Sequence, residues 1–263
     1  MTPRTAPPPA AGDVRVRMTV AYDGSPFRGF ATNPDVRTVQ DDLEAALATV
    51  LRRPTPTTCA GRTDRGVHAR GQVVSFDADA AHVDAFALTR ALNRMLAPHI
   101  TVRDVALAAN DFDARFSCIG RTYRYRILNA PTPDPLVHHL VWHVREPLDL
   151  APMQLAADRI LGEHDFTTFS KRNKSKQNET FVRTVERAVW GQTGATVQLE
   201  IRANAFTHQM VRSLVGMFVE IGRGRRPAVD MGHALQALDR SAAPSPAPPQ
   251  GLVFERAHYH GHD

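Results

Sequence analysis

The sequence predicts an α+β protein built from two halves. Segments in which apolar and polar residues alternate, as in half-buried strands, occur along the whole chain, and segments with apolar residues at helical spacing lie between them. The order of strands and helices in the first half is followed by a similar order in the second half. With 263 residues, the chain is long enough for two small domains with apolar cores.

The first half is expected over residues 14–130, after a segment rich in proline and alanine, residues 1–13, that is expected to be disordered. Apolar and polar residues alternate over 14–20, as in a strand with one buried face. A helix is expected at 39–51, because Thr38 opens a sequence that resembles a capping box. The other elements expected here are strands at 72–76, 100–106 and 118–128 and a helix at 85–96.

The second half is expected over residues 131–263. Its expected elements are strands at 140–144, 184–190, 196–203 and 252–259 and helices at 150–161 and 209–222. The proline-rich stretch 242–249 is expected to be a loop and no domain linker, because one more strand follows it.

Composition narrows the possible functions. The net charge of +5 and the pI near 9.7 favour a polyanionic partner such as nucleic acid. Cys59 and Cys118 form no CxxC motif, which fits a reducing cytoplasm, and no apolar run approaches the roughly 20 residues of a membrane-spanning helix. Because the motifs of phosphate-binding loops, dinucleotide-binding folds and serine hydrolases are all missing from the sequence, nucleotide hydrolysis and hydride transfer lose most of their support.

The first candidate site is the polar loop 61–69, with the sequence GRTDRGVHA. Its aspartate, Asp64, stands among Arg62, Arg65 and His68, and a carboxylate among basic side chains stays ionised. Aspartate is also a common turn residue. The residues alone therefore leave open whether Asp64 is catalytic or structural.

The second candidate is the segment 115–128, RFSCIGRTYRYRIL. Arg121, Tyr123 and Tyr125 would lie on one face of a strand, and further arginines on the other. Aromatic rings interleaved with arginines suit RNA, because bases stack on the rings while guanidinium groups hold phosphates. Tyrosines that pack on the core beside solvated arginines would give the same pattern.

Three further features have two interpretations each. The basic loop that contains Lys171, Arg172, Lys174 and Lys176 could contact a phosphate backbone or serve only solubility. Arg212, at the edge of an apolar helical stripe, could reach solvent or pair with a buried carboxylate. The alternating histidines at 258–262 raise the alternative of a metalloenzyme, but a terminal tail without a second set of ligands favours no metal site.

Taken together, these segments resemble the TruA family of tRNA pseudouridine synthases. The resemblance extends from residue 14 to residue 260, in the order of the family. It is carried by six segments: TVQDDLEAAL at 38–47, GRTDRGVHARGQVVSF at 61–76, RFSCIGRTYRYRILN at 115–129, GEHDFTTF at 162–169, FTHQMVRSLVGMFVEIGRGR at 206–225 and APPQGLVF at 247–254.

The resemblance implies two ferredoxin-like halves with a joined, mainly antiparallel sheet and a central RNA-binding cleft. It implies a homodimer in which tRNA contacts both subunits. It also implies the reaction, in which the uracil of a uridine at positions 38–40 of the tRNA anticodon stem-loop is detached at N1, turned and rejoined through C5. Neither a metal nor another cofactor is needed, because the reaction is an isomerisation.

The resemblance assigns roles to individual residues. Asp64 matches the nucleophilic aspartate of the family, and Arg212 matches the arginine that pairs with it and keeps it ionised. Tyr123 matches the tyrosine that stacks on the flipped uracil and helps to remove the C5 proton. Arg62 is expected to fill the space left by the base or to hold a phosphate. Further RNA contacts are expected from Arg65, Arg121, Lys171, Arg172, Lys174 and Lys176.

The sequence departs from the family pattern at two places. Residues 31–33 are Ala-Thr-Asn where glutamines are usual, and Arg65 stands where the residue is commonly small. These departures leave open a pseudouridine synthase of the same family that acts at a different RNA site. A non-catalytic RNA-binding module is the alternative from another class, and attack by Asp64 on C6 or on C1′ is equally compatible with the sequence.

Overall fold

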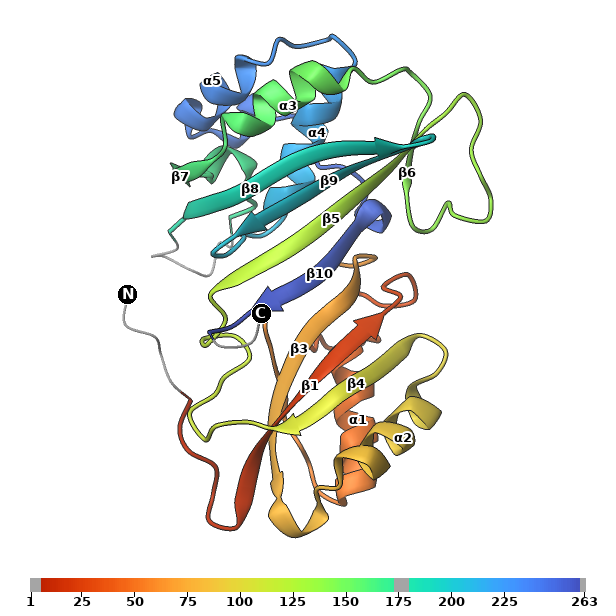
Figure 1. Cartoon of the computed structure of the whole chain (residues 1–263), viewed down its shortest axis with the longest axis vertical. Coiled ribbons are helices and arrows are strands. Elements are labelled where there is room, and N and C mark those ends of the chain that lie inside the picture. The colour runs from red at the N-terminus through yellow and green to blue at the C-terminus, as the bar shows by residue number, and fades with distance from the viewer. Residues whose placement is uncertain (1–5, 173–179, 261–263) are drawn as a thin grey trace. The chain divides into compact units, whose positions relative to one another are not determined.

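The computed structural model describes residues 6–172 and 180–260, which form two compact units (Figure 1). The first unit comprises Met1–Ile119 and Phe254–Asp263, and the second comprises Gly120–Val253. Each unit combines helices with a mainly antiparallel sheet. The predicted α+β class is confirmed.

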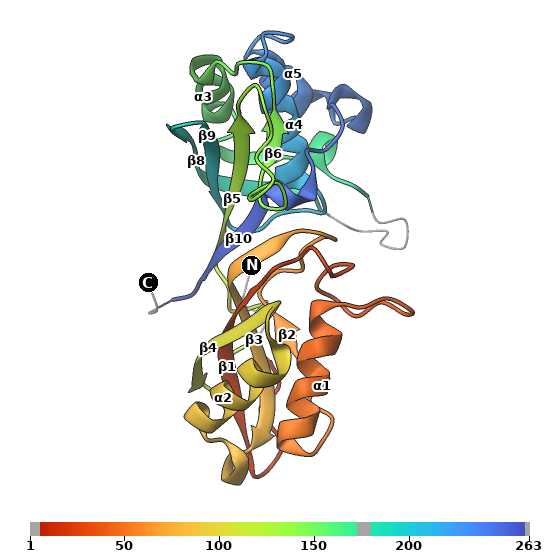
Figure 2. The same ribbon diagram turned by 90° about the vertical axis from the view of Figure 1, so that its right-hand side faces the viewer.

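The first unit has the chain order strand, helix, two strands, helix, strand. These elements are β1 (Asp13–Tyr22), α1 (Val39–Leu51), β2 (Thr58–Cys59), β3 (His68–Asp79), α2 (Ala85–Leu96) and β4 (Ile100–Leu107). In the sheet the order is β4-β1-β3, with β2 paired to β3, and all these pairs are antiparallel. Both helices lie on one face of this sheet, as Figure 2 shows.

The core of the first unit follows from the alternation in β1. Val16, Met18 and Val20 are inaccessible to solvent, as are Leu43 of α1 and Leu92 of α2. Helix α1 begins with the cap that the sequence predicted: the side chain of Thr38 accepts a hydrogen bond from the amide of Asp41. The buried face and the cap together fix where α1 begins and which side it presents to the sheet.

The other face of β1 carries a buried charge. Arg15 is 6% exposed and pairs with Asp77, which is its cross-strand neighbour on β3. The remaining guanidinium N–H groups donate to the carbonyls of Phe112 and Pro7, the latter at 3.0 Å. Arg15 therefore ties two distant loop segments to the sheet, and a buried ion pair of this kind tolerates loss of one partner poorly.

The second unit contains most of the remaining elements. They are β5 (Gly120–Asn129), β6 (Trp142–Val144), α3 (Leu150–Asp158), β7 (Gly162–Asp165), β8 (Val182–Thr193), β9 (Thr196–Ala203), α4 (Met210–Gly222) and α5 (Asp230–Ala237). The sheet order is β5-β9-β8-β7 with antiparallel pairs, and β6 pairs with β5 in parallel. The last strand, β10 (Leu252–His258), starts in the second unit and continues as part of the first.

Helix α4 is buried almost all round. Of its residues only Arg212 and Glu220 keep partial exposure. A Cβ on Gly216 would lie 2.4 Å from the carbonyl oxygen of Ser245, so only glycine allows the segment 244–248 to run this close to the helix. The loop predicted for 242–249 is confirmed, and it packs on α4.

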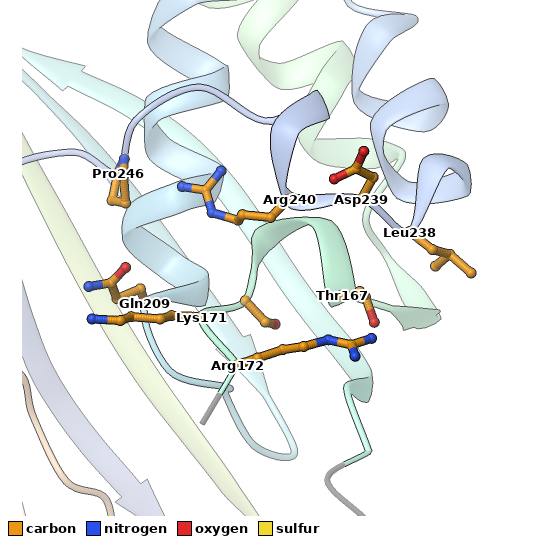
Figure 3. Close-up of a pocket in the computed structure, with 9 residues that line it drawn as sticks. Thr167, Lys171, Arg172, Gln209, Leu238, Asp239, Arg240 and Pro246 are labelled. Atoms are coloured by element: carbon orange, nitrogen blue, oxygen red, sulfur yellow. The ribbon is translucent and has the colours of Figure 1, made fainter. Parts of the chain in front are cut away.

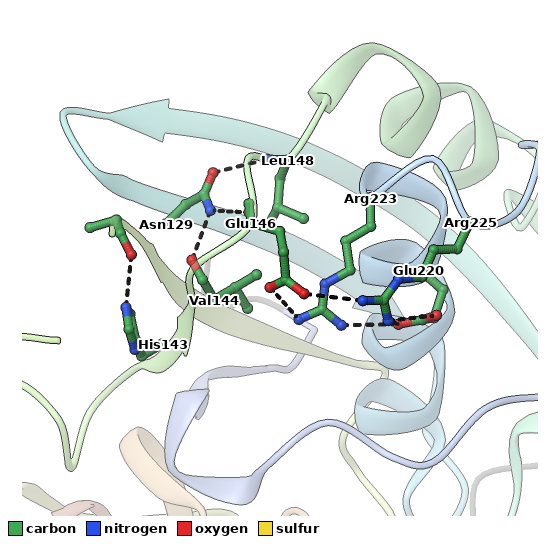
Figure 4. Close-up of polar contacts among 9 residues, drawn as sticks. Asn129, His143, Val144, Glu146, Leu148, Glu220, Arg223 and Arg225 are labelled. Carbon is green, nitrogen blue, oxygen red and sulfur yellow. Dashed lines mark hydrogen bonds and ion pairs between the residues drawn. The ribbon is translucent and has the colours of Figure 1, made fainter. Parts of the chain in front are cut away.

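A polar cluster holds the end of α4 that is remote from Arg212 (Figure 4). The carboxylate of Glu146 pairs with Arg223 and Arg225, at 3.1 Å each, and both arginines also reach Glu220. The side chain of Asn129 donates to the carbonyls of Val144 and Glu146 and accepts from the amide of Leu148. Single exposed ion pairs contribute little, but this network joins β5, β6 and α4 through shared partners.

Most predicted elements are present, with changed ends. β3 begins at His68, four residues before the expected strand, because the polar stretch after the Asp64 loop also pairs with β1. Three elements were not predicted: β2, β7 and α5. β2 has two residues, β7 (GEHD) lacks apolar alternation, and α5 buries only a short stripe. No helix within residues 6–172 and 180–260 is long and apolar enough to span a membrane.

Candidate active site

Asp64 begins a tight turn in the loop that leads into β3. The amide of Val67 donates to the carbonyl oxygen of Asp64 at 3.1 Å, which closes a four-residue turn. Gly66, at the third position, has φ of +76°, a conformation that favours glycine. Thr63 and Val67 are buried, whereas Asp64 between them is partly exposed. The carboxylate thus stands at the surface on a backbone that is fixed on both sides.

Buried polar side chains hold the chain just before Asp64. The amide group of Gln72, which is inaccessible to solvent, donates to the carbonyl of Gly61 at 2.6 Å and accepts from its N–H at 3.2 Å. The hydroxyls of Tyr22 and Thr63 are 2.7 Å apart, and the amide of Phe30 donates to the carbonyl of Thr63. Burial raises the pKa of Tyr22, so its hydroxyl keeps its proton and remains a donor.

The turn after β1 packs directly on this loop. The amide of Gly24 donates to Nδ1 of His68 at 3.1 Å. A Cβ on Gly24 would lie 2.1 Å from the carbonyl oxygen of Val67, a distance that no side chain permits. The glycine in the Asp23-Gly24-Ser25 turn is therefore required by close approach to the Asp64 loop.

The two hydrogen bonds of Gln72 give a prediction that separates loop geometry from stability. Gln72→Leu is expected to lower kcat roughly tenfold to a hundredfold, because small displacements of a reacting group cost that much. It should also destabilise the fold by about 1–3 kcal/mol for each backbone group of Gly61 left unpaired. Turnover and thermal unfolding, measured on the same samples, separate the two effects.

Asn93 offers a matched control in the same unit. Its side chain makes the same pair of bonds to one backbone residue, Val102, at 2.8 and 2.7 Å. Asn93→Leu should lose comparable stability while kcat stays near the wild-type value. Equal losses of kcat in both variants would show that Gln72 acts only through stability.

Tyr123 lies on β5 in the second unit and is 8% exposed. Its ring contacts Phe206 in a T-shaped arrangement, with centroids 5.1 Å apart and planes at 85°. Tyr125, two residues on, is fully buried and donates its hydroxyl to the carbonyl of Pro248 at 2.7 Å. Tyr125 is therefore a core residue, while Phe206 is a neighbour of Tyr123 that sequence reasoning missed, although it opens the quoted segment FTHQM.

Arg124, on the opposite face of β5, has a partner within the sheet. Arg124 lies across from Glu200 on β9, and their charged groups are 3.2 Å apart. Arg187 reaches the same carboxylate at 3.0 Å. Burial tends to raise the pKa of Glu200, but hydrogen bonds from Arg124 and Arg187 outweigh it and hold that pKa below its usual range. Arg121, in contrast, donates to the backbone carbonyl of Asn204 at 2.7 Å.

Arg212 lies in the first turn of α4. Its Nε donates to the carbonyl of Ala247 at 2.8 Å, and the amide of Ala247 donates back to the carbonyl of Arg212 at 2.9 Å. These bonds hold the guanidinium plane in one orientation at the partly exposed start of the helix. Asp64 belongs to the first unit, whereas Tyr123 and Arg212 belong to the second, so the meeting of the three side chains stays a prediction.

The other predicted contacts are distributed over both units. Arg62 and Arg65 are exposed on the Asp64 loop, and Lys171 and Arg172 are exposed before α4. Burial raises the pKa of the Cys59 thiol to about 12, and the positive charge of Arg62 acts against this shift, which places its guanidinium near that thiol. The predicted contacts Lys174 and Lys176, and His262 of the tail, lie outside the described residues. Across the described ranges no cluster of three metal-ligating side chains occurs.

Comparison with known proteins decides the family. A family model described as tRNA pseudouridine synthase matches residues 18–117 and 156–260. A tRNA pseudouridine synthase A from Klebsiella pneumoniae (strain 342) is 42% identical over 248 residues, which cover 94% of this chain and 91% of the relative. The chain belongs to the tRNA pseudouridine synthase family. The corresponding protein of Rhodospirillum centenum (strain ATCC 51521 / SW) is 42% identical over 246 residues, 93% of this chain and 99% of the relative.

Membership in the tRNA pseudouridine synthase family makes the chain an isomerase by class. The two matched segments contain Asp64 and Arg212, while Tyr123 lies between them. Among solved structures, a chain of a Cbf5-Nop10-Gar1 complex gives a TM-score of 0.34 at 13% identity, over 90% of this chain and 57% of that chain. That likeness is too weak to bear on the fold or the site.

Proposed function

We propose that this chain converts uridine to pseudouridine at positions 38–40 of the tRNA anticodon stem-loop, with Asp64 as the nucleophile. One observation carries the proposal within the family. Asp64 is a partly exposed carboxylate on a loop that buried side chains hold through hydrogen bonds, those of Thr63 with Tyr22 and of Gln72 with Gly61. A nucleophile of this kind is accessible to a flipped base while its backbone stays fixed.

The reaction balances without a redox partner. The carboxylate of Asp64 attacks C1′ of the ribose or C6 of the uracil, and the bond between C1′ and N1 breaks. The uracil turns and C5 bonds to C1′, and the bond between Asp64 and C1′ or C6 breaks, which releases the carboxylate. The proton that leaves C5 is matched by a proton taken up at N1, so that the product is an isomer of the substrate. Both modes of attack require an ionised carboxylate.

The other residues have supporting roles in this proposal. Tyr123, whose ring plane is set by Phe206, stacks on the uracil and helps to remove the C5 proton. Arg212 pairs with Asp64 and keeps it ionised. Arg62 occupies the space that the base leaves or holds a phosphate. Arg65, Arg121, Lys171, Arg172, Lys174 and Lys176 contact the RNA backbone.

The proposal includes an architecture of two ferredoxin-like halves with a joined sheet and a central cleft. The chain order of the first unit, with sheet order β4-β1-β3-β2, has that connectivity, and the order β5-β9-β8 supports it for the second unit. We extend the proposal to folding domains at 14–130 and 131–263, a homodimer whose subunits share the tRNA, and a cytoplasmic location. The mass of the protein in solution, with and without tRNA, tests the dimer.

The activity is tested with tRNA that carries labelled uridines. The purified protein is expected to form pseudouridine at positions 38–40, and a tRNA with cytidine at these positions should remain unmodified. Pseudouridine at other positions only would favour a family member with a different RNA site. RNA binding by folded protein without any pseudouridine would favour a non-catalytic RNA-binding module.

A further inference from the structure

An open pocket with a volume of about 600 Å³ lies in the second unit (Figure 3). It is lined by Thr167, Ser170, Lys171, Arg172, Gln209, Leu238, Asp239, Arg240 and Pro246. Gln209 directly precedes α4, and Pro246 directly precedes Ala247, which holds Arg212. The pocket is therefore lined by the chain neighbours of α4 and of Ala247, the residue that binds Arg212.

Positive charge gathers in this pocket without being neutralised there. Its lining has three cationic side chains and one carboxylate, that of Asp239. Lys171 and Arg172 form no ion pair with any residue in 6–172 or 180–260. By contrast, the sheet arginines of the same unit are paired: Arg124 and Arg187 with Glu200, and Arg202 with Glu186. Unpaired cations that line a concavity attract an anion.

The cationic side of the pocket is held in place by hydrogen bonds. The amide of Lys171 donates to the carbonyl of His208 at 2.9 Å. Ser170, which is 2% exposed, donates its hydroxyl to the carbonyl of Phe166 and contacts the hydroxyl of Thr207. The guanidinium of Arg172 lies 5.5 Å from the centre of the Phe181 ring. The backbone that carries Lys171 and Arg172 is thus fixed to the residues that lead into α4.

We propose that this pocket binds two phosphodiester groups of the RNA substrate, one through Lys171 and one through Arg172. The proposal rests on the proposed function. A backbone phosphate fits better than a base, because no aromatic ring lines the pocket and its charged groups are mainly cationic. Bound there, the phosphates set the position of the RNA strand relative to Arg212.

Asp239 marks the side of the pocket that an anion avoids. The backbone amide and the hydroxyl of Ser241 donate to its carboxylate and hold the pKa of Asp239 below the usual range, so the group is charged. In Figure 3, the amine of Lys171 lies beside Gln209, away from Asp239 and Leu238, whereas the guanidinium of Arg172 extends the other way, below Thr167. The two cations are therefore placed to contact two phosphates.

The test measures tRNA binding over a range of salt concentrations. Lys171→Gln/Arg172→Gln is expected to weaken binding roughly tenfold or more and to reduce the slope of log Kd against log salt by about 1–2. Arg145→Gln/Arg159→Gln is the matched control, since both arginines are exposed in the same unit and the charge change is equal. The control should bind within about twofold of wild type.

Two further experiments identify the phosphates that the pocket contacts. Asp239→Asn keeps an oxygen for the amide of Ser241 and removes the negative charge, so it should tighten binding about twofold. Synthetic anticodon stem-loops with single methylphosphonate linkages remove one backbone charge at a time. At each of the two contacted linkages, wild type should lose part of the affinity that the Lys171→Gln/Arg172→Gln protein has already lost, and that variant should lose nothing more.

The outcomes separate this inference from the proposed function. Equal losses of affinity in the pocket and control variants would overturn the phosphate site. So would the absence of any linkage at which wild type loses affinity and the Lys171→Gln/Arg172→Gln protein does not. Because binding is measured without turnover, wild type that shows the linkage effect but forms no pseudouridine contradicts only the proposed activity. Wild type that modifies tRNA with binding insensitive to the pocket contradicts only the phosphate site, and wild type that binds no tRNA contradicts both.

Discussion

Asp64→Asn is expected to bind tRNA as wild type does and to form pseudouridine at least roughly a thousandfold more slowly. An amide has nearly the size of a carboxylate but is no nucleophile. The turn at Asp64 is closed by its backbone carbonyl, so the substitution leaves the loop intact. Release of tritium from tRNA that contains [5-³H]uridine measures turnover, because the reaction breaks the C5–H bond.

Two companion variants make this result decisive. Asp64→Ala excludes activity regained by deamidation of the new asparagine. Asp104→Asn, at an exposed position of the same unit, changes the charge equally and should retain full activity. Turnover near the wild-type rate in both Asp64 variants would remove this residue from the nucleophile's role, whatever the RNA affinity.

Arg212→Lys is expected to lose roughly a hundredfold in kcat, although the positive charge is kept. Lysine cannot place a second donor on a carboxylate while it also bonds the carbonyl of Ala247, which the Nε of Arg212 does. The KM for tRNA should change much less than kcat, because the proposed pair with Asp64 would act on the reacting group. Single-turnover kinetics at saturating protein separate the two parameters.

Arg226→Lys is the control for this substitution. The guanidinium of Arg226 also donates to a backbone carbonyl in the same unit, that of Ala242 at 3.3 Å, and it is placed in no part of the site. Wild-type kcat in Arg226→Lys together with the loss in Arg212→Lys supports the pairing. If Asp64→Asn and Arg212→Lys lowered turnover by factors that simply multiply in the double variant, the two side chains would be acting independently.

The local pattern of apolar and polar residues was sufficient to predict the helices and strands that bury one face. The alternation of apolar and polar residues over 14–20 corresponds to β1, and the cap at Thr38 starts α1 as expected. The structural role in a turn that the sequence left open for Asp64 is present, since the residue does open a turn. What the pattern could not show is that this turn is held from outside by Gln72, whose polar side chain gives no sign in the sequence of being buried.

The remaining features could not be predicted from the sequence, because they depend on contacts between segments that are distant along the chain. The interleaved tyrosines and arginines of β5 looked alike in sequence, yet Tyr125 bonds to Pro248 and Arg124 to Glu200. The register between β5 and β9 places Glu200 opposite Arg124, and a single segment contains no information on that register. The same limit hid Phe206 beside Tyr123 and the pocket around Lys171.

The strand β10 has a consequence for how the protein is made. Its residues from Phe254 onward belong to the first unit: a Cβ on Gly71 would clash with Glu255, and the hydroxyl of Tyr259 donates to the carbonyl of Ala114. The unit that carries Asp64 is therefore incomplete until β10 has been synthesised. A chain truncated before this strand lacks the segment that packs on Gly71, seven residues after Asp64.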